Sequence, residues 1–245
     1  MENLESKFNP EFEERERLFK KIEVLKEKFP DIGIVLNGMR PIEKKIEVCN
    51  MAEPSAMQFR PKNAEEMRKL AMEIKEGSQN TCIHLDDPKF DEETGKMVGE
   101  KKTQIMEIIK EMGNSDNFKL ANIHLGWRDA EAILDEEGKW RNTDLANNIS
   151  GELADLFAAG IKAKRIMAIE NTGYADKTRE ILSAKPEHLL SAKQKIAEVI
   201  SAKEKMPLEE ALSKIGYTFD LGHMIKNGHL LEKNSIEDWF RKHRL

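Results

Sequence analysis

Histidine and carboxylate side chains recur near the ends of four short apolar segments of the sequence. These segments are NTCIHLD (80–86), KLANIHLGW (119–127), RIMAIENTG (165–173) and GYTFDLGH (216–223). The polar residues that they carry are His84, His124, Glu170, Asp220 and His223. Imidazole and carboxylate groups together are ligands of zinc, manganese and iron. A single histidine in a strand is more often a hydrogen-bonded structural residue, but the repetition favours a divalent metal site.

The spacing of these residues is consistent with one shared site. In a strand, residues two apart lie on the same face of the sheet. Four pairs therefore share a face, namely Cys82 with His84, Asn122 with His124, Ala168 with Glu170, and Thr218 with Asp220. In a β/α barrel the carboxyl ends of the strands meet at one mouth, where the active site is built. We therefore expect the polar residues to converge.

Six apolar segments alternate with helical patterns along the chain. Segments 32–38 and 55–61 precede the four above, and the helical patterns cover 41–52, 63–77, 101–113, 147–160 and 186–215. Strands that alternate with helices form parallel βαβ units, so the fold class is α/β. We predict a parallel (β/α) TIM-type barrel with six recognisable strands and a single domain over 1–245. It includes an N-terminal helical extension (1–30), with an amphipathic helix at 11–28, and a helical insertion (183–214).

Cap residues refine the helix boundaries. Asn63, with Glu66 three residues later, predicts a helix start at 63. Gly77 and Gly113 stand where the second and third helical patterns are expected to end.

Composition restricts the class of protein. The chain has 245 residues, of which 39% are hydrophobic and 35% charged, and a net charge of −5. No apolar run approaches the roughly 20 residues needed to span a bilayer, and the acidic N-terminus lacks the features of a secretory signal. We expect a soluble cytoplasmic protein. Cys49 and Cys82 show no CxxC spacing, and the acidic net charge makes nucleic acid a less expected partner.

The motifs CIHLD, NIHLG, IENTGY and FDLGHMIKNG resemble, in order, the third to sixth strand motifs of the xylose-isomerase-like TIM barrels. That superfamily contains sugar-phosphate isomerases and epimerases and the endonuclease IV type of abasic-site nuclease. The resemblance covers roughly residues 31–231. HLG corresponds to the family's HPG, ENTG to its EN pair, and DLGH to its D-x-x-H.

The resemblance implies a role for each polar residue. His84 and His124 match the two histidines that, with a bridging glutamate, hold one zinc in the nuclease branch. Glu170 and Asp220 match metal ligands, and they are also the expected catalytic carboxylates. His223 matches a histidine that binds a third metal in the nucleases and often contacts substrate in the isomerases. The expected cofactor is a divalent metal, zinc or manganese.

The resemblance also exposes a difference. The family has further ligands on its seventh and eighth strands, whereas the last residues here, IEDWFRKHRL, have the pattern of the sixth helix. We therefore expect a barrel that is incomplete in this chain, or one that another chain completes. Beyond HLG, Trp127 is a candidate cover for a sugar ring and Arg128 a candidate contact for a substrate phosphate. Rim packing and an exposed ion pair are the alternatives.

Three functions are compatible with this pattern. The first is a metal-dependent isomerase or epimerase of a sugar or sugar phosphate, which acts through an enediolate. The second is a zinc-dependent abasic-site nuclease, favoured by the paired histidines but not by the acidic net charge or the 6% aromatic content. The third is a non-catalytic barrel that binds a ligand or self-associates into a homo-oligomer.

Overall fold

The computed structural model describes residues 33–35, 41–43, 45–46, 56–74, 81–173, 180–218, 220 and 223. Within these residues, six strands form one parallel sheet in the order β1-β2-β3-β4-β5-β6. The strands are β1 (Gly33–Val35), β2 (Ala56–Phe59), β3 (Thr81–His84), β4 (Phe118–Ile123), β5 (Ile166–Glu170) and β6 (Ile215–Thr218). Each lies in one of the six predicted segments or overlaps it, so the strand prediction is confirmed.

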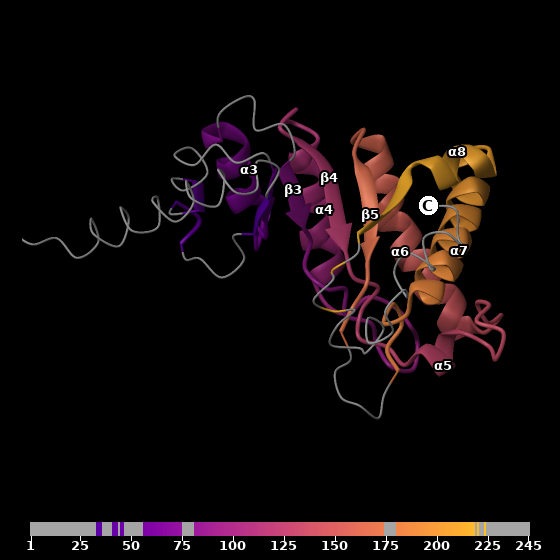
Figure 1. Cartoon of the computed structure of the whole chain (residues 1–245). Coiled ribbons are helices and arrows are strands. Elements are labelled where there is room, and N and C mark those ends of the chain that lie inside the picture. Colours follow the sequence, from indigo (N-terminus) through magenta and orange to yellow (C-terminus); the bar gives the residue numbers. More distant parts are fainter. Residues whose placement is uncertain are drawn as a thin grey trace, which may run out of the picture.

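Helices follow the strands and form a second layer along the sheet. They are α3 (Ala64–Glu73), α4 (Lys101–Met112), α5 (Ala130–Ile133), α6 (Asp144–Lys162), α7 (Pro186–Glu204) and α8 (Leu208–Ser213), and residues 42, 43, 45 and 46 are also helical. Among the larger helices, α3 packs on α4, α4 on α6, and α6 on α7, so the layer runs from one end of the sheet to the other (Figure 1). Sequential parallel strands with outer helices confirm the α/β, TIM-type prediction for the described part of the chain.

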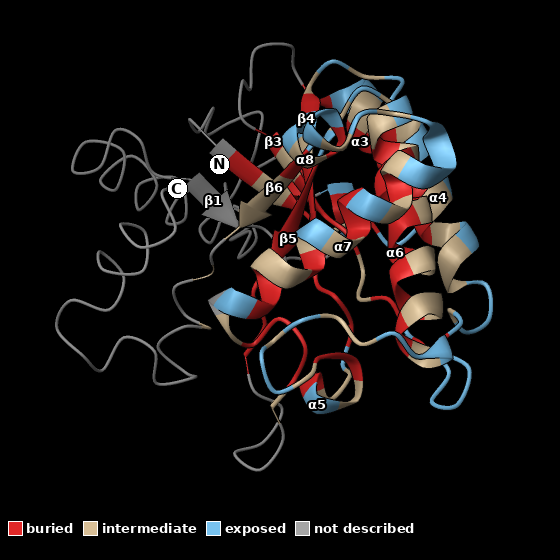
Figure 2. Ribbon diagram, turned by 90° about the vertical axis from the view of Figure 1, so that its right-hand side faces the viewer, coloured by how far each residue is buried: buried red, intermediate tan, exposed pale blue. Residues whose placement is uncertain are grey.

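The core lies between the strands and the inward faces of the helices. In α4, Ile105, Ile108, Ile109 and Met112 are all buried, as their helical spacing predicts. Figure 2 shows the buried residues on the strands and on the sides of the helices that face them, with exposed residues outside. No described helix is long and apolar enough to cross a membrane.

The cap predictions have mixed outcomes. Asn63 caps α3 by accepting a hydrogen bond from the Glu66 amide at 2.9 Å. Gly77 lies outside the described residues, whereas α3 ends at Glu73, with Ile74 as its C-cap in an extended conformation. Gly113 is the C-cap of α4, but its φ of −60° is not left-handed. The close approach of Ala163, rather than a left-handed turn, explains why a residue without a side chain stands here.

The long helical pattern at 186–215 is two helices rather than one. Lys205 adopts a left-handed conformation (φ 53°) after α7, and Pro207 precedes α8. Helix α7 packs against α6, β5 and β6. It therefore occupies the position of the helix that connects β5 to β6. The predicted helix at 11–28 lies outside the described residues.

Gly160 permits the closest approach between a helix and the sheet. It is buried in α6, and a Cβ atom at this position would overlap the Cγ and Sδ atoms of the fully buried Met167 on β5. Because both atoms are in the packed middle of the side chain, Met167 could make room only by leaving its rotamer.

This contact predicts opposite outcomes for one substitution at two positions of α6. Gly160→Ala should lower the free energy of unfolding by about 1–2 kcal/mol, since overpacking exceeds the gain in helix propensity. Gly151→Ala should raise it by about 0.5–1 kcal/mol, because the nearest atom to its added Cβ is the Lys203 Nζ at 3.9 Å. Urea denaturation of the two variants and the wild type measures both changes. Equal effects would contradict this account of Gly160.

Candidate metal centre

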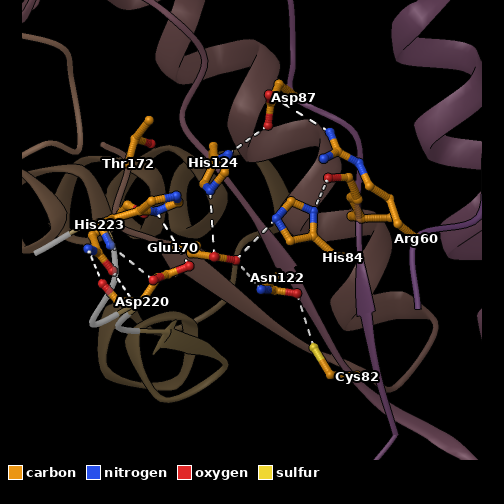
Figure 3. A network of polar contacts seen from close by, with 12 residues as sticks. Arg60, Cys82, His84, Asp87, Asn122, His124, Glu170, Thr172, Asp220 and His223 are labelled. Atoms are coloured by element: carbon orange, nitrogen blue, oxygen red, sulfur yellow. Dashed lines mark hydrogen bonds and ion pairs between the residues drawn. The ribbon is translucent and has the colours of Figure 1, made fainter. Parts of the chain in front are cut away.

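The carboxyl ends of four neighbouring strands bring five predicted residues together. His84 is the last residue of β3 and pairs in register with Asn122 on β4, two residues before His124. Glu170 is the last residue of β5 and pairs with Thr218, two residues before Asp220. Figure 3 shows these side chains pointing toward one another around Glu170. Two groups have ligand atoms within 4.8 Å of one another, namely His84, His124 and Glu170, and Glu170, Asp220 and His223.

His84 presents a bare ring nitrogen to Glu170. Its Nδ1 lies 2.7 Å from the carbonyl oxygen of Leu85, which can only accept, so Nδ1 carries the hydrogen in the neutral ring. Its Nε2 lies 3.3 Å from Oε2 of Glu170. Burial lowers the pKa of His84, so the ring is neutral near pH 7. A lone pair therefore faces a carboxylate oxygen, an arrangement that a cation between them would stabilise.

His124 is oriented by a second carboxylate. Its Nδ1 contacts Oδ1 of Asp87 at 2.7 Å, and its buried Nε2 lies 3.6 Å from Oε1 of Glu170, too far for a hydrogen bond. Burial opposes the charged form, but Asp87 and Glu170 outweigh it and raise the pKa of His124 to about 9. Without a metal, His124 is therefore an imidazolium between two carboxylates.

The spacing of these atoms fits a metal ion. Ligand atoms about 2.1 Å from a tetrahedral zinc lie about 3.4 Å from one another. The separations of 3.3 Å and 3.6 Å between the two Nε2 atoms and the Glu170 oxygens are close to this value. The donor set is imidazole and carboxylate, and the Nε2 of His124 is buried with no hydrogen-bond partner among the described residues. The residues present thus fit a divalent metal, with coordination positions left for further ligands.

Glu170 also belongs to the second group, with Asp220 and His223. The side chains of Asp220 and His223 are 38% and 30% exposed, so this side of the cluster is open. The Nδ1 of His223 lies 2.8 Å from the carbonyl oxygen of Asn171, which again leaves Nε2 for a ligand. The Asn171 side chain donates to the carbonyl of Asp220 and accepts from its amide, at 3.0 Å and 2.6 Å. Asn171 thereby holds the segment after β6 against β5.

The sequence patterns do not indicate the contacts that orient the ligands. Asn122 donates a hydrogen bond to Oε2 of Glu170, and Cys82 donates to Oδ1 of Asn122 at 3.0 Å. Burial raises the pKa of Cys82 to about 12, so its thiol remains a donor. Asp87 was missed entirely, as was Arg60, which pairs with Asp86 at 2.9 Å. The alternation of the strands places Cys82 and Asn122 on the same face as the ligands, and this indicates that they lie near the site. Asp87 lies after β3, where no such alternation indicates its position.

The two candidate substrate residues lie at the rim. Trp127 is 48% exposed, and its indole nitrogen donates to Oδ2 of Asp87 at 3.1 Å. Arg128 donates through Nη2 to the carbonyl of Glu92 at 2.9 Å, which directs it toward the loop after β3. Substrate contact by either residue remains a prediction.

Comparison with known proteins supports the fold. No protein-family model matches the sequence, and no curated protein matches it significantly. Among solved structures, a 3-keto-D-glucoside 4-epimerase from E. coli matches with a TM-score of 0.50 at 14% identity, over 87% of this chain and 75% of that chain. A xylose isomerase domain protein from Planctomyces limnophilus (TM-score 0.46, 16% identity, 80% of this chain) and a D-tagatose 3-epimerase-like protein (0.43, 19%, 78%) also match. The chain spans 64% and 65% of the length of these last two.

The chain thus has the fold of the xylose-isomerase-like TIM barrels, and the resemblance predicted from its strand motifs is confirmed at the level of the fold. At the carboxyl ends of its strands it carries a cluster able to hold a divalent metal.

The Asp87–His124 contact predicts how metal affinity responds to mutation. Asp87→Asn should weaken zinc binding roughly 10- to 100-fold, because the histidine loses the carboxylate that orients it and increases its basicity. Asp86→Asn is the matched control, since Asp86 has the same charge but pairs with Arg60 and Lys101. Competition with a chromogenic chelator measures both affinities. Equal weakening in the two variants would mean that only net charge matters.

The raised pKa of His124 predicts a pH dependence of stability in the metal-free protein. Its folded pKa is about 9 and its ordinary value 6.5. The contribution of the imidazolium, on the order of 3 kcal/mol, is complete below pH 6.5 and is lost as the pH rises to 9. Denaturation after chelation should therefore show stability falling between pH 7 and 9. His124→Gln should remove this slope; a slope that persists in the variant would assign it to other groups.

Proposed function

We propose that this protein is a metal-dependent isomerase or epimerase that acts on a sugar or sugar phosphate. The observation that carries the proposal is the buried convergence of the His84 and His124 Nε2 atoms on the Glu170 carboxylate, beside the more open Asp220 and His223. This arrangement lies at the carboxyl ends of the strands, where β/α barrels bind substrates. The similar E. coli structure is a sugar epimerase, which makes sugar chemistry the natural first test.

His84, His124 and Glu170 would hold the metal, with Asp220 and His223 at its open side. A bound divalent metal supplies Lewis acidity, which polarises a carbonyl and its neighbouring hydroxyl and so stabilises the enediolate left when the adjacent carbon loses a proton. Zinc and manganese both accept this ligand set.

The two carboxylates are placed for different tasks. Glu170 is 4% exposed, and Asn122 and His84 constrain its Oε2, so it is held as a ligand. Asp220 is more exposed, and the contacts that the described residues make with its carboxylate come from His223, through the amide at 3.0 Å and Nδ1 at 3.7 Å. We assign to the Asp220 carboxylate the role of carrying the proton between the substrate carbons. Trp127 and Arg128 would contact the substrate from the rim.

A zinc-dependent abasic-site nuclease is the second candidate. It is favoured by the His84–His124–Glu170 group, since paired histidines with a bridging glutamate match the first zinc of that branch. Against it, the acidic residues Asp86 and Asp87 lie next to the centre, with Arg60 and Lys101 already paired to Asp86. A nucleic-acid backbone is held by contacts from Lys and Arg to several phosphates, and acidic side chains beside the centre would repel it.

One experiment separates these functions. The purified chain is loaded with zinc or manganese and assayed for exchange of the ketose α-proton with deuterated solvent and for nicking of an abasic-site oligonucleotide. We expect metal-dependent exchange that Glu170→Gln and Asp220→Asn each lower at least about 100-fold, by loss of a ligand or of the proton carrier. Glu170→Gln should also lose metal, whereas Asp220→Asn should retain the metal held by the His84 group.

Nicking without exchange would replace the isomerase proposal with the nuclease. Failure of the wild type to bind stoichiometric zinc or manganese would exclude both enzymatic functions and leave the ligand-binding or self-associating barrel.

A further inference from the structure

A cavity of about 910 Å³ lies next to the metal centre, between the helical residues 42, 43, 45 and 46 and the start of α3. Its volume falls in the range of roughly 300–1,000 Å³ that is typical of small-molecule sites. Lys45, Arg60 and Lys62 are among its lining residues. None of the metal-ligand candidates lines it. The cavity therefore adjoins the metal centre without sharing its ligands.

Lys45 is the most informative residue of the cavity wall. It is only 7% exposed, and no carboxylate in the described part of the chain forms an ion pair with its ammonium group. Burial lowers its pKa, and the attraction of Glu66 offsets only part of this effect. Lys45 lines the cavity, so its ammonium group is available to an anion supplied by a ligand.

The carboxylates around the cavity are mostly occupied. Glu43 pairs with Lys69 at 2.5 Å, and Asp86 pairs with Lys101 at 2.5 Å as well as with Arg60. Glu66 accepts a hydrogen bond from the backbone amide of Lys62 at 2.9 Å. The ammonium groups of Lys45 and Lys62 therefore form no ion pair with the described residues and face the carboxylates of Glu65 and Glu66 across the cavity.

Two consecutive aspartates connect the cavity with the metal centre. The Asp86 carboxylate forms part of the cavity wall with Arg60, whereas the Asp87 carboxylate points the other way and holds His124. Arg60 also approaches Asp87, with Nη2 3.9 Å from Oδ2. Figure 3 shows Arg60 beside His84 and Asp87, at the edge of the cluster.

We propose that this cavity binds the anionic end group, phosphate or carboxylate, of a sugar whose carbonyl end reaches the metal centre. The inference rests on the proposed function and narrows its substrate class to acidic sugars. Lys45 and Lys62 would pair with the anion, and the start of α3 adds the positive end of its dipole. Arg128, on the loop after β4, is then not the residue that binds the phosphate.

The test uses inorganic phosphate as the probe and the full-length chain after removal of metal, so that phosphate cannot bind through the metal. Broadening of the phosphorus NMR signal reports binding. We expect saturable binding that Lys45→Met weakens about tenfold or more and Lys62→Met weakens less, while Lys214→Met, a change at an exposed lysine, has no effect. Thermal unfolding checks that Lys45→Met folds. If it does not fold, the effect of the exposed Lys62→Met on phosphate binding still tests whether the cavity binds the anion.

Competition then identifies the source of the anion. Displacement of phosphate by glucose 6-phosphate supports a phosphate ester, and displacement by glucuronate supports a sugar acid. Absence of saturable binding, no effect of either cavity lysine, or loss of binding in Arg128→Met instead would overturn the inference. Metal uptake measured on separate portions reloaded with zinc or manganese keeps the two proposals apart, because phosphate binding without metal uptake would refute only the metal-dependent function.

Discussion

The arrangement of the site depends on where the Nδ1 hydrogens of three histidines are held. Each Nδ1 lies 2.7–2.8 Å from an oxygen that can only accept, provided by the Leu85 carbonyl, the Asp87 carboxylate and the Asn171 carbonyl. The hydrogen is thereby fixed on Nδ1, and the Nε2 atoms are left for the centre of the cluster. Three residues far apart in sequence thus direct their Nε2 atoms toward the two ligand groups that share Glu170 without needing a metal to orient them.

At the strand ends, one of two consecutive residues faces the metal centre or its ligands, and the other binds the surrounding structure. Glu170 faces the centre, while Asn171, the next residue, binds the backbone of Asp220 and secures the end of β6. In the same way Asp87 holds His124, whereas Asp86 joins Arg60 after β2 to Lys101 at the start of α4. Because successive side chains leave an extended chain on opposite sides, one dipeptide can serve both purposes. These contacts hold the ligands in place, including His124 and Asp220, which lie just beyond the ends of their strands.

Local patterns in the sequence were sufficient to predict the strands and the convergence of the ligands. The period-two alternation that places Asn122 and His124 on one face is a property of a single strand, and the βα order dictates parallel pairing. What could not be predicted depends on contacts between segments. The Asn122–Glu170 contact follows from the register of β4 and β5, and the Asp87–His124 contact from the path of the chain after β3. Likewise, α3 ends at Glu73, where its C-cap residue Ile74 is buried in an extended conformation, a tertiary contact that the local helical pattern does not reveal.

The electrostatics of the cluster also bear on which metal it would bind. In the metal-free protein the proton on His124 balances part of the charge of Glu170 and Asp87, and it must leave before Nε2 can ligate a metal. With a pKa of about 9, this deprotonation costs about 3 kcal/mol at pH 7. Zinc stands well above manganese in intrinsic affinity for nitrogen ligands, so it tolerates this cost better. Because the same proton must leave for either metal, this cost lowers both affinities at pH 7 and leaves their order unchanged. Of the two metals in our proposal, the nitrogen ligands favour zinc, and the affinity for either metal should rise as the pH approaches 9.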